Sequence, residues 1–239
     1  MDIYNNYYTH FLAGINCNEM SNAIRSVYKE NPNHTLLSVF GSEDEPRLYS
    51  HPLDITHQVL NRKVHKQLLL LNFQRVTDPT GTRSLIWKRL CSHNFTSTFT
   101  ICIDKSAGVD ISTLPNVYAR NRQYPFWLSP RGNGIDCHRT WEALYLDIIP
   151  VVWNSTLNSL FIDLPVIILN EWSDITEQFL QNKLKQIAAN KVKIPPVYRF
   201  EKLRFSFWRH LILSKSRHSI ATTERKNQCW RGKTTFTTN

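Results

Sequence analysis

The stretch from residue 124 to residue 153 places the strongest limit on the fold of this chain. It reads Y-P-F-W-L, then S-P-R-G-N-G-I-D, then C-H-R-T-W-E-A-L-Y-L, then D-I-I-P-V-V-W. An apolar run, a turn rich in Gly and Pro, a run of good helix formers and a second apolar run predict strand, turn, helix and strand. Two consecutive strands joined by one helix pair in parallel, so the stretch predicts a parallel sheet.

The same alternation continues on both sides of this stretch. Further strands are expected at residues 68–73, 98–104 and 166–169, and further helices at 84–91, 157–162 and 175–189. This order predicts an α/β protein built on a Rossmann-like, doubly wound parallel sheet with helices on both faces. Ligands of such sheets bind beyond the carboxyl ends of the strands, where the strand order reverses.

The turn at residues 129–136, here called the glycine turn, leads into the first turn of the expected helix at 137–146. That end of a helix has unpaired N–H groups and partial positive charge, so it favours an anion. Gly132 and Gly134 let the backbone approach a ligand, and Arg131 and Arg139 add two cations. The turn therefore suits a phosphate or diphosphate, although the residues also fit a plain surface turn with an ion pair inside the helix.

The expected helix has two faces. His138, Glu142 and, more loosely, Tyr145 share one face by their spacing, and Glu142 is placed to accept hydrogen bonds from ribose hydroxyls. Asp136 is expected to cap the helix N-terminus. The opposite, apolar face is expected to pack on the sheet and consists of Trp141, Leu144 and Ile148.

Longer motifs carry a family resemblance. S-P-R-G-N-G-I-D-C-H-R-T-W-E-A-L, then I-P-V-V, then L-F-I-D-L-P-V-I-I-L-N-E-W-S-D-I-T, resembles the donor-binding half of exostosin-like glycosyltransferases, over residues 68–213. The resemblance implies a GT-B enzyme, in which two Rossmann-like domains face a cleft and the C-terminal one holds a nucleotide sugar. The residues expected to bind the donor are Arg131, Gly132, Asn133, Gly134, His138, Arg139, Glu142 and Ser155.

This resemblance implies transfer of a sugar from a nucleotide diphosphate sugar to a hydroxyl of a glycan or glycoprotein, in the Golgi or secretory pathway. No D-x-D triplet occurs, so no metal and no cofactor besides the donor are expected. The catalytic base stays unknown, with His51, Asp54 and His57 possible by position alone. The alternative is a catalytically inactive remnant that binds nucleotide sugar or a partner subunit.

Three parts of the chain are expected. Residues 1–63 form a partial N-terminal region, 64–213 the Rossmann-like domain, and 214–239 a basic, disordered tail. The net charge is +10, of which residues 199–239 contribute +8 with ten Lys or Arg and two acids. The charge therefore indicates a basic tail, which leaves polyanion binding by the tail as a third reading, and argues against specific nucleic-acid binding by the body.

No apolar run approaches the roughly 18 residues that span a bilayer, so no membrane span is expected. Residues 198–213 predict an amphipathic helix that docks on the same domain. The five cysteines lack C-x-x-C spacing, which argues against a metal site; Cys102 is expected as a buried strand residue and Cys137 in a packing role. Glycosylation sequons occur at Asn33, Asn94 and Asn154.

Four polar residues around the first expected helix complete the predictions. Asn72 and Arg75 follow the strand at 68–73 and are expected to border the ligand crevice. Thr77 and Arg83 are expected to have structural roles, in which Arg83 caps a helix or pairs with a neighbour and does not contact ligand.

Overall fold

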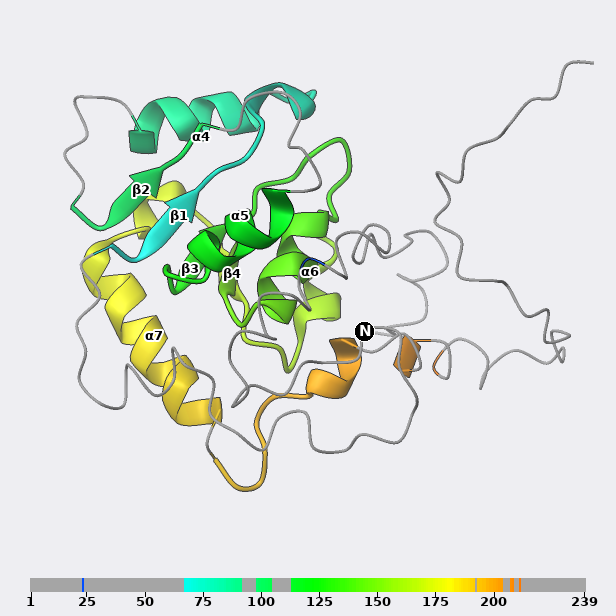
Figure 1. Ribbon diagram of the computed structural model, residues 1–239. Coiled ribbons are helices and arrows are strands. Elements are labelled where there is room, and N and C mark those ends of the chain that lie inside the picture. The colour runs from blue at the N-terminus through cyan, green and yellow to red at the C-terminus, as the bar shows by residue number, and fades with distance from the viewer. Residues whose placement is uncertain are drawn as a thin grey trace, which may run out of the picture.

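The fold is a five-stranded, fully parallel sheet. A computed structural model describes residues 67–91, 98–104, 113–191 and 193–203, together with Ala23, Phe207, Trp208 and Leu211. The strands run in the order β2-β1-β3-β4-β5 (Figure 1). They are β1 (Leu69–Leu71), β2 (Thr100–Cys102), β3 (Phe126–Leu128), β4 (Ile149–Trp153) and β5 (Ile167–Leu169). The Rossmann-like doubly wound sheet predicted from the sequence is confirmed.

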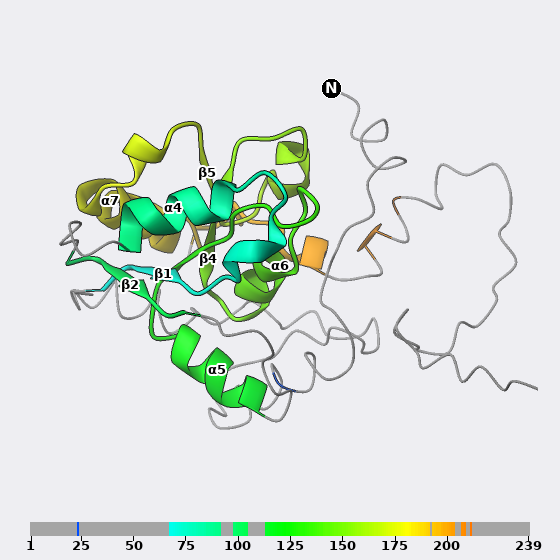
Figure 2. The same cartoon turned by 90° about the horizontal axis from the view of Figure 1, so that it is seen from above.

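Helices cover both faces of this sheet, as Figure 2 shows with α4 and α7 on one side and α5 on the other. The α-helices whose bounds lie within the described ranges are α4 (Thr82–Cys91), α5 (Leu114–Asn121), α6 (His138–Tyr145) and α7 (Glu177–Lys191). Two separate apolar cores result. Leu70 and Trp127 face α5 and α6, whereas Leu69 and Leu71 face α4 and α7. Burial on both faces explains why the strands read as continuous apolar runs without polar alternation.

The strand order reverses between β1 and β3. From β1 the chain passes to its neighbour β2 on one side and then, through α5, returns to β3 on the other side of β1. Leu69 is in register with Thr100 on β2 and with Phe126 on β3, so all three strands end at one common edge. That edge, between the ends of β1 and β3, is where a doubly wound sheet binds its ligands.

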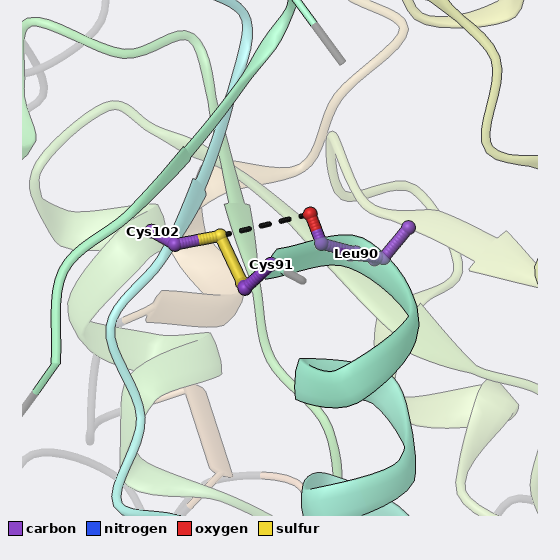
Figure 3. The surroundings of a disulfide bond; sticks show 3 residues. All are labelled: Leu90, Cys91 and Cys102. Carbon is purple, nitrogen blue, oxygen red and sulfur yellow. Dashed lines mark hydrogen bonds between the residues drawn. A yellow bond between two sulfur atoms is a disulfide. The ribbon is translucent and has the colours of Figure 1, made fainter. Parts of the chain in front are cut away.

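Helix α5 and one disulfide are absent from the sequence predictions. The segment of α5, L-P-N-V-Y-A-R-N, has Pro in its first turn and buries Leu114 and Tyr118. Cys91 at the end of α4 is bonded to Cys102 on β2 (Figure 3). Cys102 lies on a strand as expected, but it is half-buried where a buried residue was expected, and it is a disulfide partner. Its Sγ lies 3.8 Å from the Leu90 carbonyl, a plain contact because a disulfide sulfur has no proton to donate.

The other expected elements are present with shifted ends or a different type. The helix expected at 157–162 is the shorter 3₁₀-helix η3 (Asn158–Phe161), and α7 begins two residues later than expected. Two more 3₁₀-helices, η1 (Arg75–Thr77) and η4 (Trp172–Asp174), follow β1 and β5. The shifted ends fall where local sequence constrains the backbone least.

The segment after α7 packs against α6, as predicted for residues 198–213. It contains the 3₁₀-helix η5 (Phe200–Leu203), where a continuous α-helix was expected. Tyr145 O–H donates to the Leu203 carbonyl, and Trp208 Nε1 donates to the Lys202 carbonyl at 2.6 Å. Tyr145 is therefore a buried structural contact between α6 and the segment that follows α7.

Several predictions concern residues outside the described part of the chain. These are the general-base candidates His51, Asp54 and His57, the sequons at Asn33 and Asn94, Cys17, Cys229, and the basic tail at 214–239. Within the part of the chain that the structure describes, no helix has both the length and the apolar character needed to cross a membrane.

Candidate phosphate site at the sheet edge

The glycine turn leaves the end of β3 and is anchored on both sides. Ser129 N–H donates to the Val151 carbonyl of β4 at 2.8 Å, and the Ser129 hydroxyl bonds the Thr140 hydroxyl of α6 at 2.8 Å. Within the turn, Gly132 N–H donates to the Gly134 carbonyl at 3.0 Å. The sequence thus places the turn at the point of strand reversal and fixes it to the helix that follows.

Arg83 of α4 joins the two loops that border this edge. Its Nε donates to the Arg131 carbonyl at 2.7 Å and its Nη2 to the Pro130 carbonyl at 3.2 Å, both in the glycine turn. Its Nη1 donates to the Gln74 carbonyl at 3.0 Å and to the Thr77 hydroxyl, both in the loop after β1. Arg83 is buried, and these four acceptors satisfy most of its donors, which agrees with the structural role expected for Arg83 and Thr77.

Gly132 makes room for this arginine. A Cβ atom at position 132 would lie 3.1 Å from Arg83 Nη2, whereas one at position 134 would meet only the Asp136 carbonyl at 3.7 Å. Neither glycine has a backbone φ in the left-handed region. The packing of Arg83 is thus one physical reason for glycine at 132, beside the predicted approach of a ligand.

Asp78, which the sequence reasoning missed, caps α4 and faces Arg131. Its Oδ2 accepts the Arg83 backbone N–H at 3.0 Å, and its Oδ1 accepts the Thr80 N–H at 3.0 Å and the Thr80 hydroxyl at 2.7 Å. Burial raises the pKa of Asp78, but the hydrogen bonds from Thr80 and Arg83 and the charge of Arg131 outweigh burial and hold the pKa below its usual value. An Asp followed closely by Pro, Thr and Gly is a turn and capping signal that points to this role.

Two arginines at the turn have donors without acceptors. Arg139 is buried, lies over the rings of Phe73 and Trp127 at 5.8 and 5.7 Å, and has no hydrogen-bond partner for its Nε. Arg131, half-exposed, has a buried Nε that lies 3.8 Å from Asp78 Oδ1, an ion-pair distance that is too long for a hydrogen bond. Burial and the charge of Arg139 lower the pKa of Arg83. Three arginines therefore lie close together at the turn, and a bound anion would reduce the repulsion between them.

The N-terminus of α6 opens toward the same turn. Cys137 is its N-cap residue and makes no side-chain cap hydrogen bond. Asp136 instead accepts a hydrogen bond from Trp141 Nε1 at 2.9 Å, so the prediction that Asp136 caps the helix was wrong. Cys137 Sγ lies 3.6 Å from Arg83 Nη2, which agrees with its expected packing role. The N-cap residue thus gives the first turn no side-chain acceptor, and the Thr140 N–H donates to the Cys137 carbonyl at 3.0 Å.

The structure brings together most, but not all, of the predicted donor-binding residues. Arg131, Gly132, Asn133, Gly134, His138 and Arg139 lie in the glycine turn and the first turn of α6. Glu142 is buried further along α6, and its charge reaches Tyr118 of α5, whose pKa is raised by burial and by Glu142. Ser155 lies in a different loop, the one after the neighbouring strand β4, where its Oγ accepts the Leu157 N–H at 3.2 Å. None of these positions tests ligand binding, which stays a prediction.

Asn72 and Arg75, expected to border the crevice, have other partners. Asn72 is buried, accepts the Trp127 Nε1–H at 2.5 Å and donates to Asn121 Oδ1 at 3.3 Å. Arg75 pairs with Asp104 at 3.2 Å on the exposed side of the sheet edge. Asn72 thus connects β1, β3 and α5 inside the domain.

No protein-family model and no curated protein sequence matches this chain. The resemblance to exostosin-like glycosyltransferases therefore stays an expectation drawn from the motifs. Among the described residues, no group of three or more His, Cys, Asp or Glu lies close enough together to hold a metal ion.

Proposed function

We propose that this chain binds the diphosphate of a nucleotide sugar at the glycine turn and forms the donor-binding part of a glycosyltransferase. One observation carries the proposal: Arg139 is buried at the N-terminus of α6 with its Nε unpartnered, at the edge where the strand order reverses. A buried guanidinium with a free donor is costly unless an anion binds it. Phosphate groups suit this position because they meet helix N–H groups and guanidinium forks together.

The charged side chains around the glycine turn support an anionic ligand. The described side chains around the turn are three arginines, Arg83, Arg131 and Arg139, and three carboxylates, Asp78, Asp136 and Glu142. Asp78 is engaged by Thr80 and Arg83, so it does not neutralise Arg139. Arg139 Nε therefore stays available to a ligand, and its charge favours an anion over a neutral metabolite.

The same groups suit the chemistry of glycosyl transfer. As the bond between the sugar and the diphosphate breaks, negative charge grows on the leaving phosphate oxygen. Arg131, Arg139 and the α6 N-terminus are placed to stabilise that charge, and a preorganised donor of this kind contributes about 3 to 4 kcal/mol. In this proposal Glu142 accepts hydrogen bonds from the ribose, and His138 contacts the phosphate or the sugar.

Calorimetric titration of the full chain with UDP, GDP and their sugars tests the proposal. Arg139→Met and Arg131→Ala are each expected to weaken binding roughly tenfold to a hundredfold, the loss of one charge-assisted hydrogen bond. Arg131→Ala is the safer variant because that side chain is half-exposed, and Arg89→Ala on the exposed side of α4 is the matched control. Absence of binding by every nucleotide, or full affinity in both variants, rejects the proposal. Binding without turnover of labelled donor favours the inactive, donor-binding alternative.

A further inference from the structure

We infer that the sugar of the donor lies over the ends of β4 and β5, that a cluster of three asparagines holds it, and that this sugar is neutral. The amide cluster consists of Asn154, Asn158 and Asn170. This inference rests on the proposed function, because the cluster continues the phosphate site along the same edge of the sheet.

The cluster is held together by its own hydrogen bonds. Asn158 Nδ2 donates to Asn154 Oδ1 at 2.6 Å, and Asn154 Nδ2 donates to Asn170 Oδ1 at 2.8 Å. Ser155 N–H donates to Asn158 Oδ1 at 3.0 Å and so closes the loop beneath. Within the described part of the chain, Asn170 Nδ2 has no partner, and Asn154 and Asn170 are exposed.

Such a cluster suits sugar hydroxyls. An amide both donates and accepts, as a hydroxyl does, and each NH₂ group here that is used once still has a second N–H to offer. Because the amides already fix one another, binding orders few additional side chains, which reduces the entropic cost.

The sheet register places the cluster beside the phosphate site. Ser129 N–H bonds the Val151 carbonyl, so the glycine turn and the end of β4 are neighbours, and Asn154 N–H bonds the Leu169 carbonyl of β5 at 2.8 Å. Adjacent strands lie about 4.8 Å apart, so the turn and Asn170 are separated by two spacings, roughly 10 Å. A phosphate and an attached sugar ring together cover this separation.

The charges near the cluster select against an acidic sugar. The two loops that carry the cluster, residues 154–160 and 170–176, contain no Lys or Arg and two acids, Glu171 and Asp174. Glu171 directly follows Asn170 and is exposed. A carboxylate on the sugar would meet no nearby cation from these loops and would be repelled by Glu171, so a neutral sugar is favoured over a uronic acid.

The test compares nucleotides with nucleotide sugars by calorimetry, on full chain secreted to the bacterial periplasm so that Asn154 carries no glycan. UDP-glucose or GDP-mannose is expected to bind about tenfold more tightly than its nucleotide, a gain of two or more hydrogen bonds. UDP-glucuronic acid is expected to bind no more tightly than UDP. Asn170→Asp keeps the acceptor for Asn154 and removes the free NH₂, so it should abolish the tenfold gain and leave UDP and GDP affinity unchanged.

Asn182→Asp on α7 is the matched control, since Asn182 is an exposed amide that accepts from Gln178 at 2.9 Å, and it should change nothing. The inference is overturned if Asn170→Asp retains the gain, or if UDP-glucuronic acid binds more tightly than UDP-glucose. If UDP and GDP bind but no neutral sugar adds affinity, the inference fails alone. If no nucleotide binds to the wild-type chain, the proposed function fails and the sugar site with it.

Discussion

Replacement of Arg83 by lysine should destabilise the domain strongly although it changes no residue of the two apolar cores. Arg83 donates to three backbone carbonyls and one hydroxyl, and it connects the loops after β1 and β3. Lysine has one nitrogen on a flexible chain and reaches at most two of these oxygens in their fixed positions. Each buried acceptor left without a donor costs about 1 to 3 kcal/mol, so Arg83→Lys is expected to lower the free energy of unfolding by about 3 kcal/mol or more.

Urea unfolding followed by circular dichroism measures this loss, as a lower midpoint with an unchanged slope. Arg89→Lys is the control because Arg89 lies exposed on the same helix, and its effect is expected within about 0.5 kcal/mol of zero. A loss below about 1 kcal/mol in Arg83→Lys would show that solvent or neighbouring groups replace the lost hydrogen bonds.

The hydrogen-bonded Arg83 side chain also predicts an energetic coupling between positions 83 and 132. Alanine at 132 places its Cβ 3.1 Å from Arg83 Nη2, so Gly132→Ala is expected to cost about 1 to 3 kcal/mol when Arg83 is present. With lysine at 83 the same alanine should cost at least about 1 kcal/mol less. Gly134→Ala, whose Cβ makes only a 3.7 Å contact, should have little effect in either background. Equal costs of Gly132→Ala in both backgrounds would show that another constraint requires this glycine.

Three further predictions concern stability. Asp78→Asn should lower the free energy of unfolding by about 2 kcal/mol at pH 7 because hydrogen bonds to the carboxylate are lost. Since the folded pKa of Asp78 is lowered, this stabilisation is present above about pH 4 and disappears as pH falls through the folded pKa. Urea unfolding at several pH values should therefore show the difference in stability between wild type and Asp78→Asn shrink as the pH falls; a constant difference would contradict the assignment. Dithiothreitol should lower the free energy of unfolding by about 3 kcal/mol by opening the short loop between Cys91 and Cys102, and a Cys102→Ser variant should not respond to it. Lys191→Met should lower the free energy of unfolding by about 3 to 5 kcal/mol, because it removes the cation that lies 2.5 Å from the buried Asp147 carboxylate. Adding Asp147→Asn should restore much of this loss, and no recovery in the double variant would contradict a charge effect.

The features that local sequence could predict are those that depend on one segment at a time. The buried strands were recognisable as apolar runs, and the stretch 124–153 gave strand, turn, helix and strand because one βαβ unit is nearly self-contained. The edge of strand reversal followed from the parallel alternation. These predictions needed no knowledge of which side chains meet.

The features that were missed depend on partners far apart in sequence. Arg83 lies 47 and 48 residues from the two carbonyls that it holds in the glycine turn, and no local pattern pairs them. The disulfide was missed because cysteine spacing alone does not determine pairing. Helix α5 was missed because L-P-N-V-Y-A-R-N is only eight residues long, so the helix is stabilised by packing, such as the burial of Tyr118, and not by propensity.

A replacement of Arg139 should affect ligand affinity and domain stability in different ways, because a residue that binds a ligand need not stabilise the domain. Its charge lies beside Arg83, whose pKa it lowers, and its Nε has no acceptor. Methionine has a similar length, and its sulfur can lie against the rings of Phe73 and Trp127 that Arg139 now covers. Replacing such a buried charge by an apolar side chain is often neutral or stabilising by about 1 to 4 kcal/mol. Arg139→Met is therefore expected to retain or raise the urea midpoint while it abolishes most nucleotide affinity. A loss of several kcal/mol with unchanged affinity would instead make Arg139 a structural residue and remove the main support for a phosphate at this turn.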